Sequence, residues 1–140
     1  MKAILAKMEL GVSCPLFGHS VRAGFPNPAD DYQEISLDLN EHVIRHPSAT
    51  YFVRAEGDSM TSLGIFSGDL LVVDRANDAS DQSVVIVALN GELTCKIYDE
   101  KGKRLLSANN LYPPIHVNED MDAICEGVVT FVLKDLRCLR

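Results

Sequence analysis

The sequence lacks the features that mark membrane-spanning and secreted proteins. Its 140 residues contain no uninterrupted apolar run of about 18 residues, the length that a bilayer-spanning helix requires. Near the N-terminus, Lys7, Glu9 and Gly11 interrupt the apolar residues that a secretory signal would need. We therefore expect a soluble, cytoplasmic protein that makes no contact with a membrane.

Positive charge is also scarce, with 13 Lys and Arg residues against 20 Asp and Glu residues and a net charge of -7. Nucleic-acid binding through phosphates requires clustered Lys and Arg, so the charge balance argues against a general phosphate-binding surface. The charge is uneven: Lys2, Lys7 and Arg22 against Glu9 make residues 1–23 cationic, whereas the remainder is strongly acidic. The cationic arm could lie across the acidic body or be a detachable piece, and charge does not decide between these.

Metal-ligand spacing is missing as well. The chain has four cysteines and four histidines but no CxxC pair. His42 and His46 stand four residues apart without the carboxylate of an HExxH motif. We therefore expect reduced thiols, no metal site and no cofactor.

One globular domain with a leading arm fits what is present. The chain is 46% hydrophobic and 24% charged, and it contains no internal repeat. From Gly24 onward, Pro26 and Pro28 predict an extended segment without helix, because each proline disfavours helical geometry in its predecessor. The sequence thus predicts an N-terminal arm over residues 1–30 and a domain over residues 31–140.

The domain is predicted to be mainly β, with about seven short strands in a barrel or sandwich and one short helix. Asn90-Gly91 is a strong hairpin signal and Lys101-Gly102 marks a further turn. Asn40 can cap a helix that Pro47 stops. The strands are expected at 35–39, 50–55, 70–74, 84–89, 92–98 and 123–133 (one strand or two joined at Gly127), and the helix at 41–45.

Ser59 is a candidate nucleophile. It follows the strand predicted at 50–55, and Gly57 allows a tight backbone turn before it. Such a turn can expose the hydroxyl and direct neighbouring backbone N–H groups toward one point, as an oxyanion hole requires. Local sequence alone favours the simpler interpretation, in which Ser59 only caps a turn.

Lys96 is the candidate base, because no histidine has a strand-end setting with a carboxylate to orient it. It is the lysine that lies within an apolar strand, and burial would disfavour its charged form. Strand alternation places Lys96 with Glu92 and Thr94, opposite Cys95 in the core. On that pattern alone, Lys96 is interpreted as a solvated strand lysine.

A set of motifs in fixed order resembles the UmuD/LexA family of self-cleaving Ser-Lys peptidases. The motifs that carry the resemblance are Gly57-Asp58-Ser59-Met60, Gly64-Ile65, Gly68-Asp69-Leu70-Leu71-Val72-Val73-Asp74, Gly91-Glu92 and Thr94-Cys95-Lys96. The segments 24–29 and 46–53 extend the likeness, which is greater to UmuD-like members than to LexA repressors and covers the chain from about residue 16 onward.

The resemblance implies both a fold and a set of roles. It implies a compact, mainly antiparallel peptidase domain in which Ser59 is the nucleophile and Lys96 the general base. The backbone amides of Asp58 and Ser59 would be the oxyanion donors, and Ala23-Gly24 would be the bond that is cleaved. The Asp58 side chain is expected to point away from Lys96, because pairing would keep the lysine protonated. A lysine base also predicts that self-cleavage accelerates as the pH rises toward ~10.

The same resemblance implies a cellular role. Only 23 residues precede the expected cleavage site, too few for a helix–turn–helix domain, so no sequence-specific DNA binding is expected. UmuD-like members form homodimers, are stimulated by RecA filaments on single-stranded DNA, and serve a UmuC-like Y-family DNA polymerase in translesion synthesis during the SOS response. The alternative is a non-catalytic interaction module of the same fold that regulates a polymerase.

Overall fold

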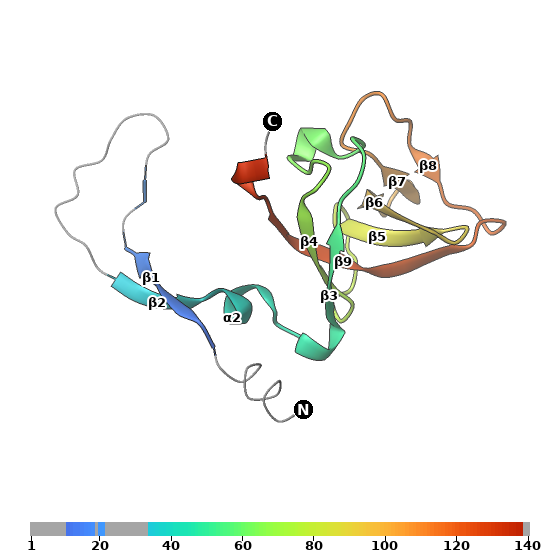
Figure 1. Ribbon diagram of the computed structural model, residues 1–140. Coiled ribbons are helices and arrows are strands. Elements are labelled where there is room, and N and C mark those ends of the chain that lie inside the picture. Colours follow the sequence, from blue (N-terminus) through green and yellow to red (C-terminus); the bar gives the residue numbers. More distant parts are fainter. Residues whose placement is uncertain (1–10, 19, 22–33, 139–140) are drawn as a thin grey trace. The chain divides into compact units, whose positions relative to one another are not determined.

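The computed structural model describes residues 11–18, 20–21 and 34–138, which form two units that divide between Val43 and Ile44. In the first unit, β1 (Ser13–Phe17) pairs antiparallel with β2 (Glu34–Asp38), and α2 (Leu39–Val43) follows (Figure 1). The sequence missed β1. The predicted boundary at residues 30 and 31 lies outside the described residues.

The helix after β2 begins earlier than the sequence predicted. It spans Leu39–Val43, and the Asn40 backbone N–H donates a 3.0 Å hydrogen bond to the Asp38 carboxylate. The prediction that Asn40 caps a helix over 41–45 was therefore wrong. Asp38 fills that role because its side chain stands one position before the first helical residue.

The second unit is an antiparallel seven-stranded sheet within residues 44–138, in the order β3-β4-β9-β5-β6-β7-β8. Its strands are β3 (Thr50–Arg54), β4 (Leu70–Asp74), β5 (Val84–Leu89), β6 (Glu92–Asp99), β7 (Arg104–Leu106), β8 (Ile115–His116) and β9 (Ala123–Leu133). Short 3-10 helices lie at Pro47–Ala49, Thr61–Leu63 and Leu136–Cys138. The prediction of a mainly β, antiparallel domain is confirmed, and the hairpin turn at Asn90-Gly91 joins β5 to β6 as expected.

The segment after Ala123 is one strand that bends at Gly127. The register of β9 shifts where it pairs with β4 and with β5. A Cβ atom on Gly127 would lie 2.7 Å from Val73 Cγ1 and 3.1 Å from the Asp74 carbonyl oxygen. Glycine is therefore required here for the close approach of β9 to β4, and a bulge at this point increases the local bend.

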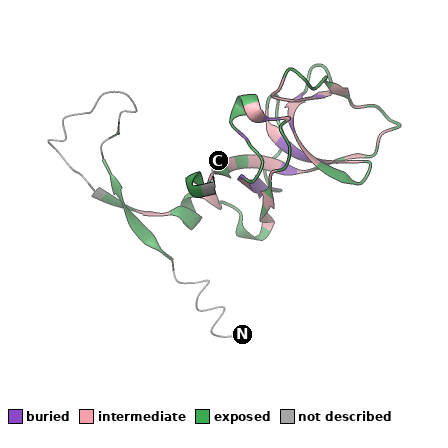
Figure 2. Cartoon of the chain, turned by 45° about the horizontal axis from the view of Figure 1, so that its top comes forward, coloured by how far each residue is buried: buried purple, intermediate pink, exposed green. Residues whose placement is uncertain are grey.

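Two apolar clusters make up the core of the second unit, and its buried segments lie along the central strands (Figure 2). The first cluster contains Met60, Ile65, Leu71, Val73 and Ile86. The second contains Val85, Val87 and Leu105. Met60 and Ile65 come from the segment between β3 and β4, so the loop that carries Ser59 is anchored in the first cluster.

Candidate functional site

Ser59 lies in a turn between β3 and the 3-10 helix Thr61–Leu63. Gly57 adopts φ +89°, the left-handed conformation that glycine adopts without steric cost, as its place before the serine predicted. The Thr61 hydroxyl and backbone N–H both donate to the Asp58 carbonyl oxygen, at 3.2 and 3.4 Å. Met60 is buried immediately after Ser59, so the turn holds the serine half-buried at the edge of the core.

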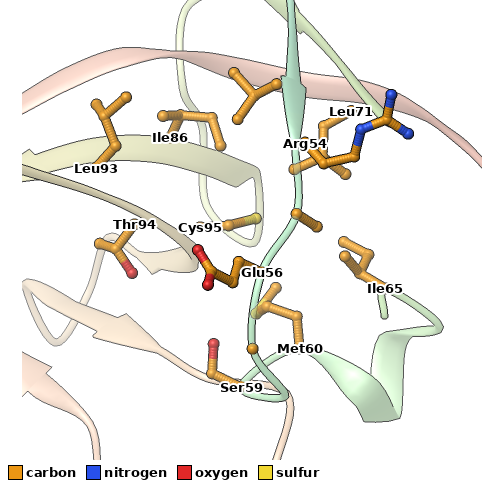
Figure 3. Close-up of a pocket in the computed structure, with 13 residues that line it drawn as sticks. Arg54, Glu56, Ser59, Met60, Ile65, Leu71, Ile86, Leu93, Thr94 and Cys95 are labelled. Atoms are coloured by element: carbon orange, nitrogen blue, oxygen red, sulfur yellow. The ribbon is translucent and has the colours of Figure 1, made fainter. Parts of the chain in front are cut away.

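A pocket of about 210 Å³ opens beside Ser59, whose hydroxyl points into it (Figure 3). Its lining mixes apolar side chains with polar ones, Glu56 and Thr94 among them (Figure 3). The apolar lining comes mainly from Met60, Ile65, Leu71 and Ile86. A pocket of this size and chemistry suits a small apolar side chain.

Ser59 and Asp58 retain unused hydrogen-bonding groups. Within the described part of the chain, neither the Ser59 hydroxyl nor the backbone N–H groups of Asp58 and Ser59 form a hydrogen bond. These N–H groups are thus available to the carbonyl oxygen of a bound peptide, which is what an oxyanion site needs.

Lys96 is buried, with 7% of its surface exposed. The pairing of Ile97 with Leu106 places Ser107 beside Lys96, and Lys96 Nζ donates a 2.9 Å hydrogen bond to Ser107 Oγ. The pattern-based interpretation of a solvated lysine was wrong, because strand alternation does not show that the loop after β7 packs against Lys96. Burial lowers the pKa of Lys96 from its usual value, as a general base requires.

The segment 107–112 touches both candidate catalytic regions. The Tyr112 ring centroid lies 5.6 Å from Lys96 Nζ, and the Tyr112 hydroxyl donates to the Asp58 carboxylate. The Asn109 side-chain amide donates a 2.8 Å hydrogen bond to the Asp58 carbonyl oxygen. One loop therefore ties the Ser59 turn to the buried lysine.

In the part of the chain that the structure describes, Ser59 and Lys96 do not share a hydrogen bond. Ser59 nonetheless lines the same pocket as Thr94 and Cys95, the two residues before Lys96 (Figure 3). Nucleophile–base hydrogen bonds are often long without substrate and shorten when it binds. Ala23 and Gly24, the expected cleavage site, lie outside the described residues.

Sequence reasoning missed Ser107, Asn109 and Tyr112. They belong to a loop with no motif of its own, and only the pairing of β6 with β7 brings this loop to Lys96. Cys95 packs against the first apolar cluster, which confirms its prediction as a core residue. Burial raises the pKa of its thiol to about 11.

His46, one of the two histidines four residues apart, pairs with a carboxylate. His46 Nδ1 lies 2.6 Å from the Asp74 carboxylate, so this histidine is engaged at the end of β4. Among the described residues, no three His, Cys, Asp or Glu side chains gather as metal ligands would. Nor does any helix in the described ranges have the length and hydropathy needed to cross a membrane.

Comparison with known proteins gives consistent matches over most of the chain. Residues 15–130 match the model of the Peptidase S24-like family. Protein SamA of Salmonella typhimurium is 47% identical over 108 residues, covering 76% of this chain and 77% of that protein. Protein MucA of Escherichia coli is 38% identical over 131 residues, covering 91% and 90%. The LexA repressor of Pseudomonas chlororaphis is 36% identical over 125 residues, covering 87% of this chain and 61% of the repressor.

Proposed function

The chain belongs to the Peptidase S24-like family, and we propose that it is a serine peptidase that cleaves itself between Ala23 and Gly24. Ser59 is the nucleophile and Lys96 the general base in this proposal. The observation that carries it is the burial of Lys96, which lowers its pKa, on the strand whose Thr94 and Cys95 line the Ser59 pocket.

In the proposed reaction, Lys96 both accepts and donates the proton that is transferred. Neutral Lys96 takes the proton from the Ser59 hydroxyl as Oγ bonds to the carbonyl carbon of Ala23. The N–H groups of Asp58 and Ser59 stabilise the negative oxygen of the tetrahedral intermediate. The Lys96 ammonium then gives its proton to the nitrogen of Gly24 as the peptide bond breaks. Water hydrolyses the acyl-enzyme, again with Lys96 as the base.

The pocket supports cleavage after a small residue. Much of its lining is apolar, and its volume of about 210 Å³ accepts the methyl group of alanine. Glycine on the other side of the bond carries no Cβ, so the substrate backbone can approach Ser59 closely.

The cellular role we propose is that of an SOS-response mutagenesis protein. Cleavage, stimulated by RecA filaments on single-stranded DNA, removes the cationic residues 1–23 and leaves an acidic homodimeric product. That product serves as an accessory subunit of a UmuC-like Y-family DNA polymerase in translesion synthesis. Similarity to MucA, at 38% identity along 90% of that protein, supports this role.

Intact mass spectrometry tests the chemistry. The purified chain is incubated at about pH 7 and about pH 10, and with activated RecA filaments, beside the Ser59→Ala and Lys96→Ala variants. We expect a fragment that begins at Gly24, more of it at high pH, and none from either variant. Cleavage that persists in Ser59→Ala would refute the assignment of the nucleophile.

A non-catalytic interaction module is the second candidate, favoured by the missing hydrogen bond between Ser59 and Lys96. An intact chain under every condition, together with undiminished polymerase stimulation by Ser59→Ala, would support that module instead.

A further inference from the structure

The Tyr112 side chain contacts both Lys96 and the residue directly before Ser59. Its ring lies against Lys96 Nζ, with 5.6 Å between the nitrogen and the ring centroid. Its hydroxyl donates to the carboxylate of Asp58, the residue directly before Ser59. Lys96 is 7% exposed, whereas Tyr112 is 42% exposed, so the tyrosine lies on the solvent side of a buried amino group.

The Asp58 carboxylate would stop Lys96 from acting as a base if the two side chains formed an ion pair. An opposite charge within about 4–6 Å stabilises the protonated form of a lysine and raises its pKa. Among the described contacts, Asp58 and Lys96 form no ion pair, and the carboxylate is bound to the Tyr112 hydroxyl instead. The Asp58 carboxylate is thus bonded to the Tyr112 hydroxyl, and Lys96 Nζ to Ser107.

The rest of the loop fixes Tyr112 in this position. The Asn109 amide donates to the Asp58 carbonyl oxygen at 2.8 Å. The Ser62 backbone N–H donates to the Ala108 carbonyl oxygen at 2.7 Å. The loop is thereby joined to the Ser59 turn on both sides of the serine.

We propose that Tyr112 is a positioning residue whose hydroxyl keeps the Asp58 carboxylate from pairing with Lys96, and that the self-cleaving activity depends on this restraint. The inference rests on the proposed function for the role of the lysine, but the restraint itself is a property of the folded chain. Without the hydroxyl, the Asp58 carboxylate loses its hydrogen-bond partner and becomes free to pair with Lys96.

Few other charged groups face Lys96. Its neighbour Cys95 on β6 is a protonated thiol, since burial raises its pKa to about 11. The facing strand β5 places apolar Val85 opposite Lys96, and the loop after β7 contributes the neutral Ser107. Glu56, from the segment that carries Ser59, lines the same pocket as Thr94 and is the second carboxylate to consider.

The test measures the titration of Lys96 directly, in the Ser59→Ala chain so that no cleavage interferes. Lysines labelled with carbon-13 at Cε are followed by NMR from pH 6 to 12, and Lys96→Met identifies the resonance. We expect Tyr112→Phe to raise the titration midpoint of Lys96 by about one pH unit, and Tyr112→Phe/Asp58→Asn to abolish that rise. Tyr98→Phe, which removes a hydroxyl elsewhere on β6, is the matched control and leaves the midpoint unchanged.

Two results would overturn the inference. One is an unchanged Lys96 midpoint in Tyr112→Phe. The other is a raised midpoint that persists in the double variant, which would assign the shift to Glu56 or to altered solvation. In the chain with Ser59 intact, the pH–rate midpoint of cleavage should move upward with the Lys96 titration. If no chain cleaves, the proposed function fails, while the NMR titration still decides the role of Tyr112.

Discussion

Lys96 Nζ donates a hydrogen bond of 2.9 Å to Ser107 Oγ. The two residues lie 11 positions apart and meet because β6 and β7 form a hairpin that ends next to Ser107. A neutral amine keeps N–H hydrogens to donate, so this bond can persist when Lys96 acts as a base. It then directs the nitrogen lone pair away from Ser107.

Removal of the Ser107 hydroxyl, which accepts the hydrogen bond from Lys96, should slow self-cleavage. Ser107→Ala leaves Lys96 Nζ free to rotate, and a misplaced base costs about 10- to 100-fold in rate. Ser107→Thr keeps the hydroxyl and should retain most of the activity. The measurement is the cleavage rate at about pH 9, followed by intact mass. Equal rates for Ser107→Ala and the unmodified chain would contradict the role of the hydrogen bond.

Lys96→Met should stabilise the fold in a pH-dependent way. Burial lowers the pKa of Lys96, so the unfolded chain binds the proton more tightly and the stability of the parent chain rises with pH. The gain from methionine is therefore largest near neutral pH, roughly 2–4 °C in Tm, and shrinks as the pH approaches the ordinary lysine value of about 10.4. Thermal denaturation against pH checks this, with the exposed Lys101→Met as control. A rise in the Tm of Lys96→Met that is the same at every pH would contradict this prediction.

Cys95 should resist alkylation in the folded chain. Its burial raises the pKa of the thiol to about 11, and the thiolate is the reactive form. At about pH 8, iodoacetamide should label Cys95 about 100-fold more slowly than the exposed Cys125, as peptide mapping will show. In denaturant, the two thiols should react alike. Rapid labelling of Cys95 in the folded chain would mean that β6 opens.

Lys134 should be needed for stability because it pairs with a buried carboxylate. Its Nζ lies 2.6 and 2.8 Å from the two oxygens of Asp69, which is 3% exposed. Burial raises the pKa of Asp69, but the bonds from Lys134 and the Phe66 N–H outweigh it and lower the value overall. Lys134→Met should therefore cost about 2 kcal/mol in the free energy of unfolding.

The pH dependence of that cost has a definite sign. Because the folded pKa of Asp69 is lowered, the stabilisation is present above the unfolded value of about 3.9 and is lost as the pH falls through the folded value. Urea denaturation near pH 7 and near pH 3 should show the difference between Lys134→Met and the unmodified chain at neutral pH, and a smaller one in acid. A variant within about 0.5 kcal/mol of the parent at pH 7 would show that Asp69 needs no cation.

Continuous apolar runs in the sequence correctly predicted two of the central strands. Leu70–Asp74 and Val84–Leu89 are apolar on both faces and appear at the predicted residues. Strand β1 escaped prediction because it is exposed along its whole length and carries no alternation of apolar and polar residues. Its partner strand lies beyond a long connection, and strands paired across such a distance leave no signature in either segment.

The sequence by itself carried the ordered motifs whose resemblance to the UmuD/LexA family pointed to Ser59 and Lys96 as candidate catalytic residues. Residue pattern alone favoured a turn serine and a solvated lysine. Tertiary structure decided that Lys96 is buried rather than solvated, and that Ser107 and Tyr112 surround it. The physical reason is that alternation assigns a side chain to one face of a strand but does not reveal what covers that face. The pKa of a lysine is set by that cover.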